Sequence, residues 1–238
     1  MILADMHIHS SFSDGKLNIP QIVDLYGSLG FGAIGITDLL YDTSSLQGKA
    51  ALYLGKTLTA AKFPLYAGIL KSESERAWDQ YQMILIPGIE FVQGSTRLIG
   101  LGVSEYHSSD TELLKLTQSI HHHGGITVAG QPLNERFLGE IDAWEVTKGG
   151  SKFNEIILQS KLPKIAGSGF RSTRQLSSWK TVFDEEKNPQ AILEAIRKQN
   201  LSFRYFNEVN YARIHHLSNV HALDFSDLYR NLRHSYFA

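Results

Sequence analysis

The sequence contains no cysteine, which excludes disulfide frameworks, cysteine-ligated metals and cysteine nucleophiles. It also lacks any run of about 18 apolar residues, so we expect no membrane-spanning helix and no membrane partner. Lys and Arg number 23 against 24 Asp and Glu, so the positive excess that drives non-specific nucleic-acid binding is missing. Polar residues begin at Asp5, so we expect no signal peptide. We therefore expect a cytoplasmic protein, and 238 residues suit a single domain.

Strand-like and helix-like segments alternate along most of the chain. Hydrophobic periodicity predicts strands at residues 1–9, 31–37, 84–91, 98–103, 126–129, 143–146 and 164–166, and helices at 19–29, 110–123, 151–161 and 189–199, with a mainly helical stretch at 40–82. Such alternation is typical of an α/β protein with a parallel sheet, and the length favours a closed or distorted barrel. Residues 201–238 are aromatic and contain histidine, and we expect them to form a C-terminal extension packed on the barrel.

Polar residues gather at the predicted C-terminal ends of the strands, where barrels of this class carry their active sites. His7 and His9 are two residues apart on a strand, so both imidazoles leave the same face. Two imidazoles can converge on one metal ion, and Glu90 from another strand end can complete a three-ligand site like that of catalytic zinc. The alternative is that both histidines are strand-end residues hydrogen-bonded to loops.

The motif Asp5-Met-His-Ile-His9, followed by Ser13-Asp14-Gly15, closely resembles the first motif of the PHP family, the polymerase and histidinol phosphatase domain. The resemblance covers roughly residues 1–200 and continues in order through Ile36-Thr-Asp38, Ile86-Pro-Gly-Ile-Glu90, the segment from Gly124 to Pro132, Glu145-Val146 and Gly167-Ser168. It implies a distorted (β/α)7 TIM-like barrel. Typical members bind up to three metal ions at the strand C-termini and hydrolyse phosphoesters.

Several metal-ligand positions of the family pattern are lost in this chain. Carried over residue by residue, the resemblance implies that the remaining ligands are His7, His9, Glu90 and Asp14. Five positions depart from the pattern, and they hold Leu39, Arg97, Gln131, Gly169 and Arg171. None of these is a good ligand, because Leu and Gly have no donor atom, Arg stays protonated and Gln is weak and neutral. We therefore expect at most one divalent ion, either zinc, iron or manganese, and no nucleotide cofactor.

Two functions from different classes are consistent with this pattern. The first is a metal-dependent phosphoesterase with a mononuclear site that acts on a phosphorylated small molecule or another anion. In that case Arg171, Arg97 and Asp38 are catalytic, and Gln131 joins the two arginines in binding substrate. The second is a catalytically inactive PHP-fold protein that binds an anionic ligand or a protein partner through Arg97 and Arg171. A further alternative is that the arginines merely neutralise Asp38, Glu90 or Glu145.

Overall fold

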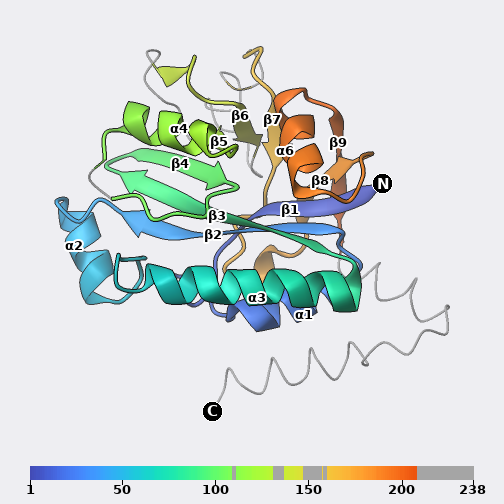
Figure 1. Cartoon of the computed structure of the whole chain (residues 1–238), viewed down its shortest axis with the longest axis horizontal. Helices are drawn as coiled ribbons and strands as arrows, with labels where there is room; N and C mark the ends of the chain where they lie inside the picture. The colour runs from blue at the N-terminus through green and yellow to red at the C-terminus, as the bar shows by residue number, and fades with distance from the viewer. Residues whose placement is uncertain (109–110, 131–136, 147–156, 158–159, 208–238) are drawn as a thin grey trace.

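The computed structural model describes residues 1–108, 111–130, 137–146, 157 and 160–207 (Figure 1). The strands are β1 (Ile2–Ile8), β2 (Ala33–Tyr41), β3 (Ile84–Gln93), β4 (Thr96–Leu101), β5 (Ile126–Ala129), β6 (Ala143–Val146), β7 (Lys164–Ala166), β8 (Ser178–Phe183) and β9 (Leu201–Phe206). The helices are α1 (Ile19–Ser28), α2 (Leu46–Tyr53), α3 (Phe63–Tyr81), α4 (Leu113–His122) and α6 (Pro189–Arg197), with a 3-10 turn at Thr173–Gln175. Most of the helix predicted at 151–161, and the tail after residue 207, lie outside the described residues.

The strands form one sheet in the order β7-β6-β5-β4-β3-β2-β1-β8-β9, with β1 and β3 each parallel to β2. The segment that follows β7 returns to β1, because Phe170 donates from its amide to the carbonyl of His7 at 3.0 Å. The hydroxyl of Thr181 on β8 bonds both backbone groups of Ala166 on β7, accepting at 2.9 Å and donating at 3.0 Å. The sheet is therefore a nearly closed, barrel-shaped α/β structure, as predicted in outline.

The sheet is mixed, whereas strict alternation of strands and helices predicts a parallel one. Strand β4 runs antiparallel to β3 and β5, and β8 runs antiparallel to β1 and β9. The cause is visible at the β3–β4 connection, which consists of Gly94 and Ser95 alone. A parallel crossover needs about a dozen residues, so two residues can only form a hairpin. Leu201–Phe206, predicted as the start of an extension, is instead the edge strand β9.

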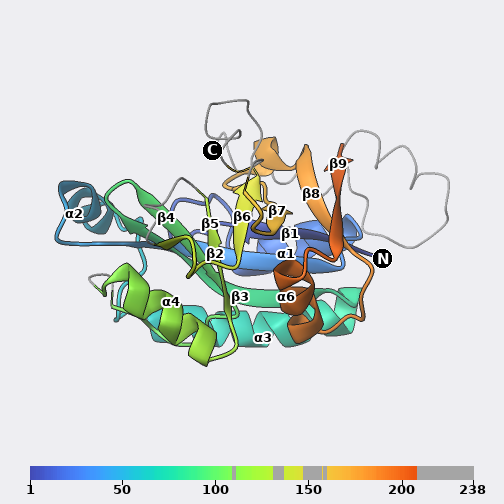
Figure 2. The same cartoon turned by 90° about the horizontal axis from the view of Figure 1, so that it is seen from above.

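Helices cover the sheet and bury its apolar side chains. One cluster packs strand residues against α1, α3 and α4, and a second packs alternate strand residues against α6. Figure 1 shows α1 and α3 side by side below the strands and α4 and α6 above them, and Figure 2 shows α2 at one end of the molecule and β8 and β9 towards the other. Within the described ranges, none of the helices combines the length and hydropathy that crossing a bilayer requires.

A buried ion pair joins the strands beneath the C-terminal end of β1. Asp5 on β1 accepts a hydrogen bond from Lys180 Nζ on β8 at 2.5 Å, and both side chains are fully buried. The same carboxylate accepts from the hydroxyl of Tyr26 at 2.8 Å and from the amide and hydroxyl of Ser168 at 3.0 and 2.6 Å. Burial alone would raise the pKa of Asp5, but Lys180 and the two donors of Ser168 together outweigh burial and lower it. Asp5 is therefore ionised and ties β1 to α1, β8 and the turn after β7.

We expect the substitution Lys180→Met to lower the free energy of unfolding by about 3–5 kcal/mol, because it leaves the Asp5 carboxylate buried without its counter-charge. Chemical denaturation monitored by circular dichroism measures this loss. The matched control is Lys198→Met, since Lys198 pairs with Glu194 at the surface and its removal should cost less than about 1 kcal/mol. Equal losses in the two variants would show that the buried pair has no special role.

Candidate metal centre

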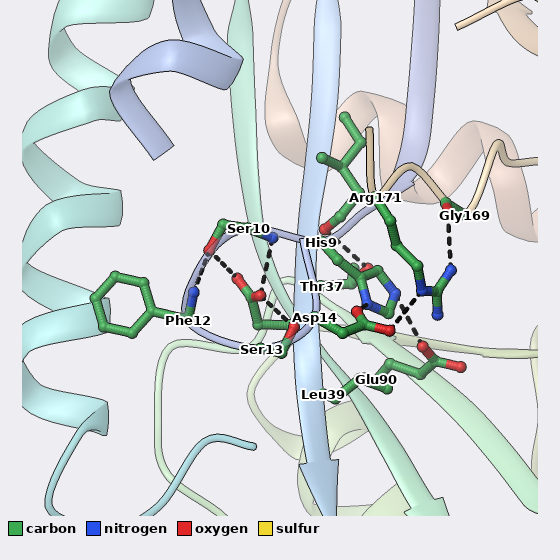
Figure 3. A network of polar contacts seen from close by, with 12 residues as sticks. His9, Ser10, Phe12, Ser13, Asp14, Thr37, Leu39, Glu90, Gly169 and Arg171 are labelled. Atoms are coloured by element: carbon green, nitrogen blue, oxygen red, sulfur yellow. Dashed lines mark hydrogen bonds and ion pairs between the residues drawn. The ribbon is translucent and has the colours of Figure 1, made fainter. Parts of the chain in front are cut away.

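Two histidines and one glutamate bring three ligand atoms together at the C-terminal end of β1. The Nε2 atoms of His7 and His9 are 2.8 Å apart, and Glu90 Oε2 from β3 lies 3.2 Å from the first and 3.0 Å from the second. All three side chains are buried, and Figure 3 shows the His9 ring facing Glu90. The geometry therefore gathers two imidazole nitrogens and one carboxylate oxygen around a single point, as a three-ligand metal site requires.

The outward nitrogen of each imidazole is held by a second carboxylate. Glu145 Oε1 on β6 lies 2.7 Å from His7 Nδ1, and Asp14 Oδ1 lies 2.6 Å from His9 Nδ1. Metal-binding histidines typically donate their second ring nitrogen to a carboxylate in this way, which fixes the tautomer and the orientation of the ring. Both rings are therefore fixed with Nε2 directed towards Glu90.

The charges in this cluster are balanced by direct contact. Burial alone would lower the pKa of His7, but Glu145 and Glu90 outweigh burial and raise it to about 10. Burial would raise the pKa of Glu90, yet His7 and His9 hold it well below its usual range. Asp14 behaves similarly, because His9 and Arg171 outweigh burial and lower its pKa to about 2. His7 is therefore a cation between two carboxylates when no metal is bound, and its Nε2–H faces His9 Nε2 and Glu90.

The two arginines predicted to bind substrate contact this cluster through its carboxylates. Arg97 Nη1 on β4 donates to Glu90 Oε1 at 3.0 Å, so Glu90 faces the imidazoles with one oxygen and a guanidinium with the other. Arg171 Nε donates to Asp14 Oδ2 at 2.6 Å, and its Nη1 donates to the carbonyl of Gly169 at 2.8 Å (Figure 3). One sequence-based alternative was that the arginines only neutralise Asp38, Glu90 or Glu145. Arg97 does pair with one of these carboxylates, Glu90, whereas Arg171 pairs with Asp14, which that alternative did not include.

Asp38, predicted as a catalytic residue, is buried and bonded to the loop that follows β1. Its carboxylate accepts from the amide and hydroxyl of Ser10 at 2.9 and 2.6 Å and from the hydroxyl of Ser13 at 2.5 Å. Burial raises the pKa of Asp38 despite these donors. In this arrangement Asp38 anchors the loop that carries Asp14. Gln131, predicted to bind substrate, lies outside the described residues.

Comparison with solved structures identifies the architecture. A two-domain protein from Bacteroides vulgatus ATCC 8482, described as containing a predicted PHP-like metal-dependent phosphoesterase, superposes with a TM-score of 0.67 at 16% identity. The match covers 86% of this chain but only 64% of that one, so the chain spans less than two thirds of its length. PsfC from Pseudomonas syringae PB-5123 matches with a TM-score of 0.51 at 13% identity, over 91% of this chain and 96% of PsfC.

The chain has a PHP-like fold. No family model and no curated protein sequence matches it, so the likeness lies in the three-dimensional arrangement. The superposition agrees with the fold that the sequence motifs imply, although the mixed sheet differs from a simple (β/α)7 alternation.

Glu145 is the residue of the candidate site whose contact with His7 the sequence did not indicate. It is separated from His7 by 138 residues, and the sequence marked it only as a strand-end residue, as part of the Glu145-Val146 motif and as a carboxylate that an arginine could neutralise. Gly167 makes this contact possible, because a Cβ atom at that position would lie 2.1 Å from Glu145 Oε1 and 2.9 Å from His7 Cβ. The absence of a side chain at residue 167 therefore lets the carboxylate reach the imidazole.

We expect Gly167→Ala to lower the free energy of unfolding by about 1–3 kcal/mol, since the added methyl group must displace either Glu145 or His7. The matched control is Gly68→Ala on α3, where a Cβ atom would meet nothing within 4 Å. That substitution should stabilise the helix by about 0.5–1 kcal/mol. Denaturant titration compares the two variants, and a neutral Gly167→Ala protein would contradict the packing described for Glu145.

Proposed function

We propose that this chain is a metal-dependent phosphoesterase with one divalent cation bound by His7, His9 and Glu90. The observation that supports the proposal is the convergence of two Nε2 atoms and one carboxylate oxygen within 2.8–3.2 Å, with each opposite Nδ1 bonded to a carboxylate. The phosphoesterase description attached to the Bacteroides vulgatus structure points to the same chemistry. The proposed substrate is a phosphorylated small molecule or a related anion.

The donor set fits a cation of intermediate softness. Two imidazole nitrogens and a carboxylate suit zinc, iron or manganese, and three protein ligands leave a position open for water or substrate. When bound, such an ion polarises a phosphoryl oxygen and lowers the pKa of its bound water. Glu145 and Asp14 would contribute by keeping the two imidazoles in the orientation that presents Nε2. We therefore assign Asp14 a positioning role beside its predicted role as a ligand.

The arginines would supply the positive charge that additional cations supply in a fuller site. Arg97 already contacts Glu90 Oε1, the oxygen that points away from the imidazoles. A guanidinium has five N–H donors, and the contacts described for Arg97 and Arg171 use only some of them. The remaining donors suit the oxygens of a phosphate, and we propose that both arginines, together with Gln131, bind substrate. Asp38 would act through the loop it anchors.

A second candidate function is a catalytically inactive barrel that binds an anion or a protein partner. The observation that favours it is that Arg97 and Arg171 are both engaged with carboxylates, Glu90 and Asp14. These ion pairs lower the negative charge available to attract a cation. Metal content separates the two candidates, because only the hydrolase needs an ion.

We expect the purified protein, prepared without a histidine tag, to bind about one equivalent of zinc, iron or manganese and to hydrolyse an aryl phosphate slowly. His9→Ala should abolish both properties, and Glu145→Gln should weaken metal affinity by about 10- to 100-fold. Elemental analysis, calorimetric titration and release of nitrophenol measure these effects.

The control for that experiment is His121→Ala. His121, near the end of α4, bonds Asp142 just before β6, and we expect its loss to leave metal content unchanged. If the His9→Ala protein retained full metal content and activity, the assignment of the metal site would be wrong. If the unaltered protein took up no metal even after reconstitution, the inactive barrel would be the correct alternative.

Inorganic phosphate should raise the melting temperature of the unaltered protein more than that of Arg171→Ala, because the substitution removes a donor group for the anion. Differential scanning fluorimetry across a phosphate titration measures the shift. Arg174→Ala is the matched control, since Arg174 is a nearby arginine with an exposed side chain. Equal shifts in all three proteins would exclude Arg171 from the anion site.

A further inference from the structure

Helix α2 exposes apolar side chains that an ordinary surface helix would bury. Leu46, Tyr53 and Leu54 are 87%, 90% and 63% exposed, and within the helix only Gly48 and Ala51 are buried. Two more exposed leucines lie in the same part of the chain: Leu52 in α2 and Leu65 in the first turn of α3. Single exposed leucines are common, but a helix that presents most of its apolar residues to solvent marks an interaction surface.

The exposed helix is firmly attached to the barrel. Its first turn is capped by Ser45, whose hydroxyl accepts from the Gly48 amide at 2.9 Å. The incoming chain is bonded to β3 through the Asp42 amide and the Val92 carbonyl, at 2.9 Å. The outgoing chain returns to β2, where the Leu58 amide donates to the Leu39 carbonyl at 2.7 Å. The apolar side chains are therefore presented by a fixed scaffold.

The same segment is rich in lysine and contains no acidic residue. Residues 43–72 include Lys49, Lys56, Lys62 and Lys71 and no Asp or Glu, although the whole chain has a net charge of −1. Lys49 and Lys56 are exposed, and Lys62 Nζ donates to backbone carbonyls, those of Gly55 and Thr57. The chain between Asp42 and Glu73, which includes the apolar helix, therefore carries four positive charges and no negative one.

We propose that α2 and the beginning of α3 dock this protein on the surface of a membrane that contains anionic lipid. Lysines attract such a surface, and leucine and tyrosine side chains insert at the boundary between headgroups and acyl chains. The lack of a spanning helix is consistent with this, because a docked helix lies in the interface. The inference differs from the sequence-based expectation of no membrane partner, which rested on the absence of a spanning run.

The placement of the apolar residues favours lipid over a protein partner. Leu52, Tyr53 and Leu54 are consecutive, so their side chains leave the helix about 100° apart and surround its end. A folded protein partner would need a matching pocket for each of these side chains. Fluid lipid accommodates side chains that point in different directions. Figures 1 and 2 both show α2 at one extremity of the molecule.

Docking through α2 would hold the candidate site near the lipid surface. Helix α2 follows the C-terminal end of β2, and β2 is parallel to β1, which carries His7 and His9 at its own C-terminal end. Both features therefore lie at the same end of the barrel. The docking proposal does not depend on the proposed phosphoesterase function.

The test is co-sedimentation of the full chain with vesicles of phosphatidylcholine, with and without phosphatidylserine, at low salt. We expect binding only to the vesicles that contain phosphatidylserine, and the double substitutions Leu46→Ser/Tyr53→Ser and Lys49→Glu/Lys56→Glu should each weaken it by more than about tenfold. The matched control is Trp179→Ser/Phe203→Ser, which removes two aromatic side chains, 47% and 42% exposed, from β8 and β9. Circular dichroism verifies that each variant is folded.

Three results would overturn the proposal. The first is no sedimentation with phosphatidylserine vesicles. The second is an equal loss of binding in the control variant. The third is tighter binding to an acidic polypeptide, polyglutamate, than to the vesicles, which would indicate a protein partner. The His9→Ala protein should bind vesicles as the unaltered protein does, so failure of the metal proposal and failure of the docking proposal remain distinguishable.

Discussion

The buried carboxylate of Asp5 accepts hydrogen bonds from three segments that are distant in sequence, and the position of the histidines depends on it. Lys180, Tyr26 and Ser168 bring β8, α1 and the turn after β7 against β1. An unpaired carboxylate at this depth would be strongly destabilising, so the pairing must form for the barrel to close. His7 and His9 follow on the same strand, and their place in space is thereby fixed.

Around those histidines, Glu90, Asp14 and Glu145 each contact a group of opposite charge. Glu90 lies between the imidazoles and Arg97, and Asp14 lies between His9 and Arg171. Burying a charge is costly unless it is paired, and here a chain of five side chains is paired in sequence: Arg97, Glu90, His9, Asp14 and Arg171. The same network keeps the imidazole Nε2 atoms directed to one point. The electrostatic and the geometric requirements of the site are thus met by the same contacts.

The sequence predicted the elements that depend on local pattern. The strand that carries His7 and leads to His9, the strand that carries Glu90 and helices α1 and α6 follow from periodicity and turn residues close to them in the chain. It did not predict the antiparallel placement of β4 and β8 or the pairing of β9, because strand direction depends on connections and on tertiary packing. Nor did spacing indicate that Arg171 would pair with Asp14, 157 residues away, or that Glu145 would orient His7.

The hairpin between β3 and β4 allows the residue beside Glu90 to change independently of the strand that carries the histidines. It places residue 97 beside Glu90 through a connection of two residues, with no contribution from β1. A substitution at position 97 alters what Glu90 Oε1 meets, while the strand beneath the histidines and its buried ion pair stay intact. One codon can therefore adjust the charge of this site during evolution without disturbing the fold that supports it.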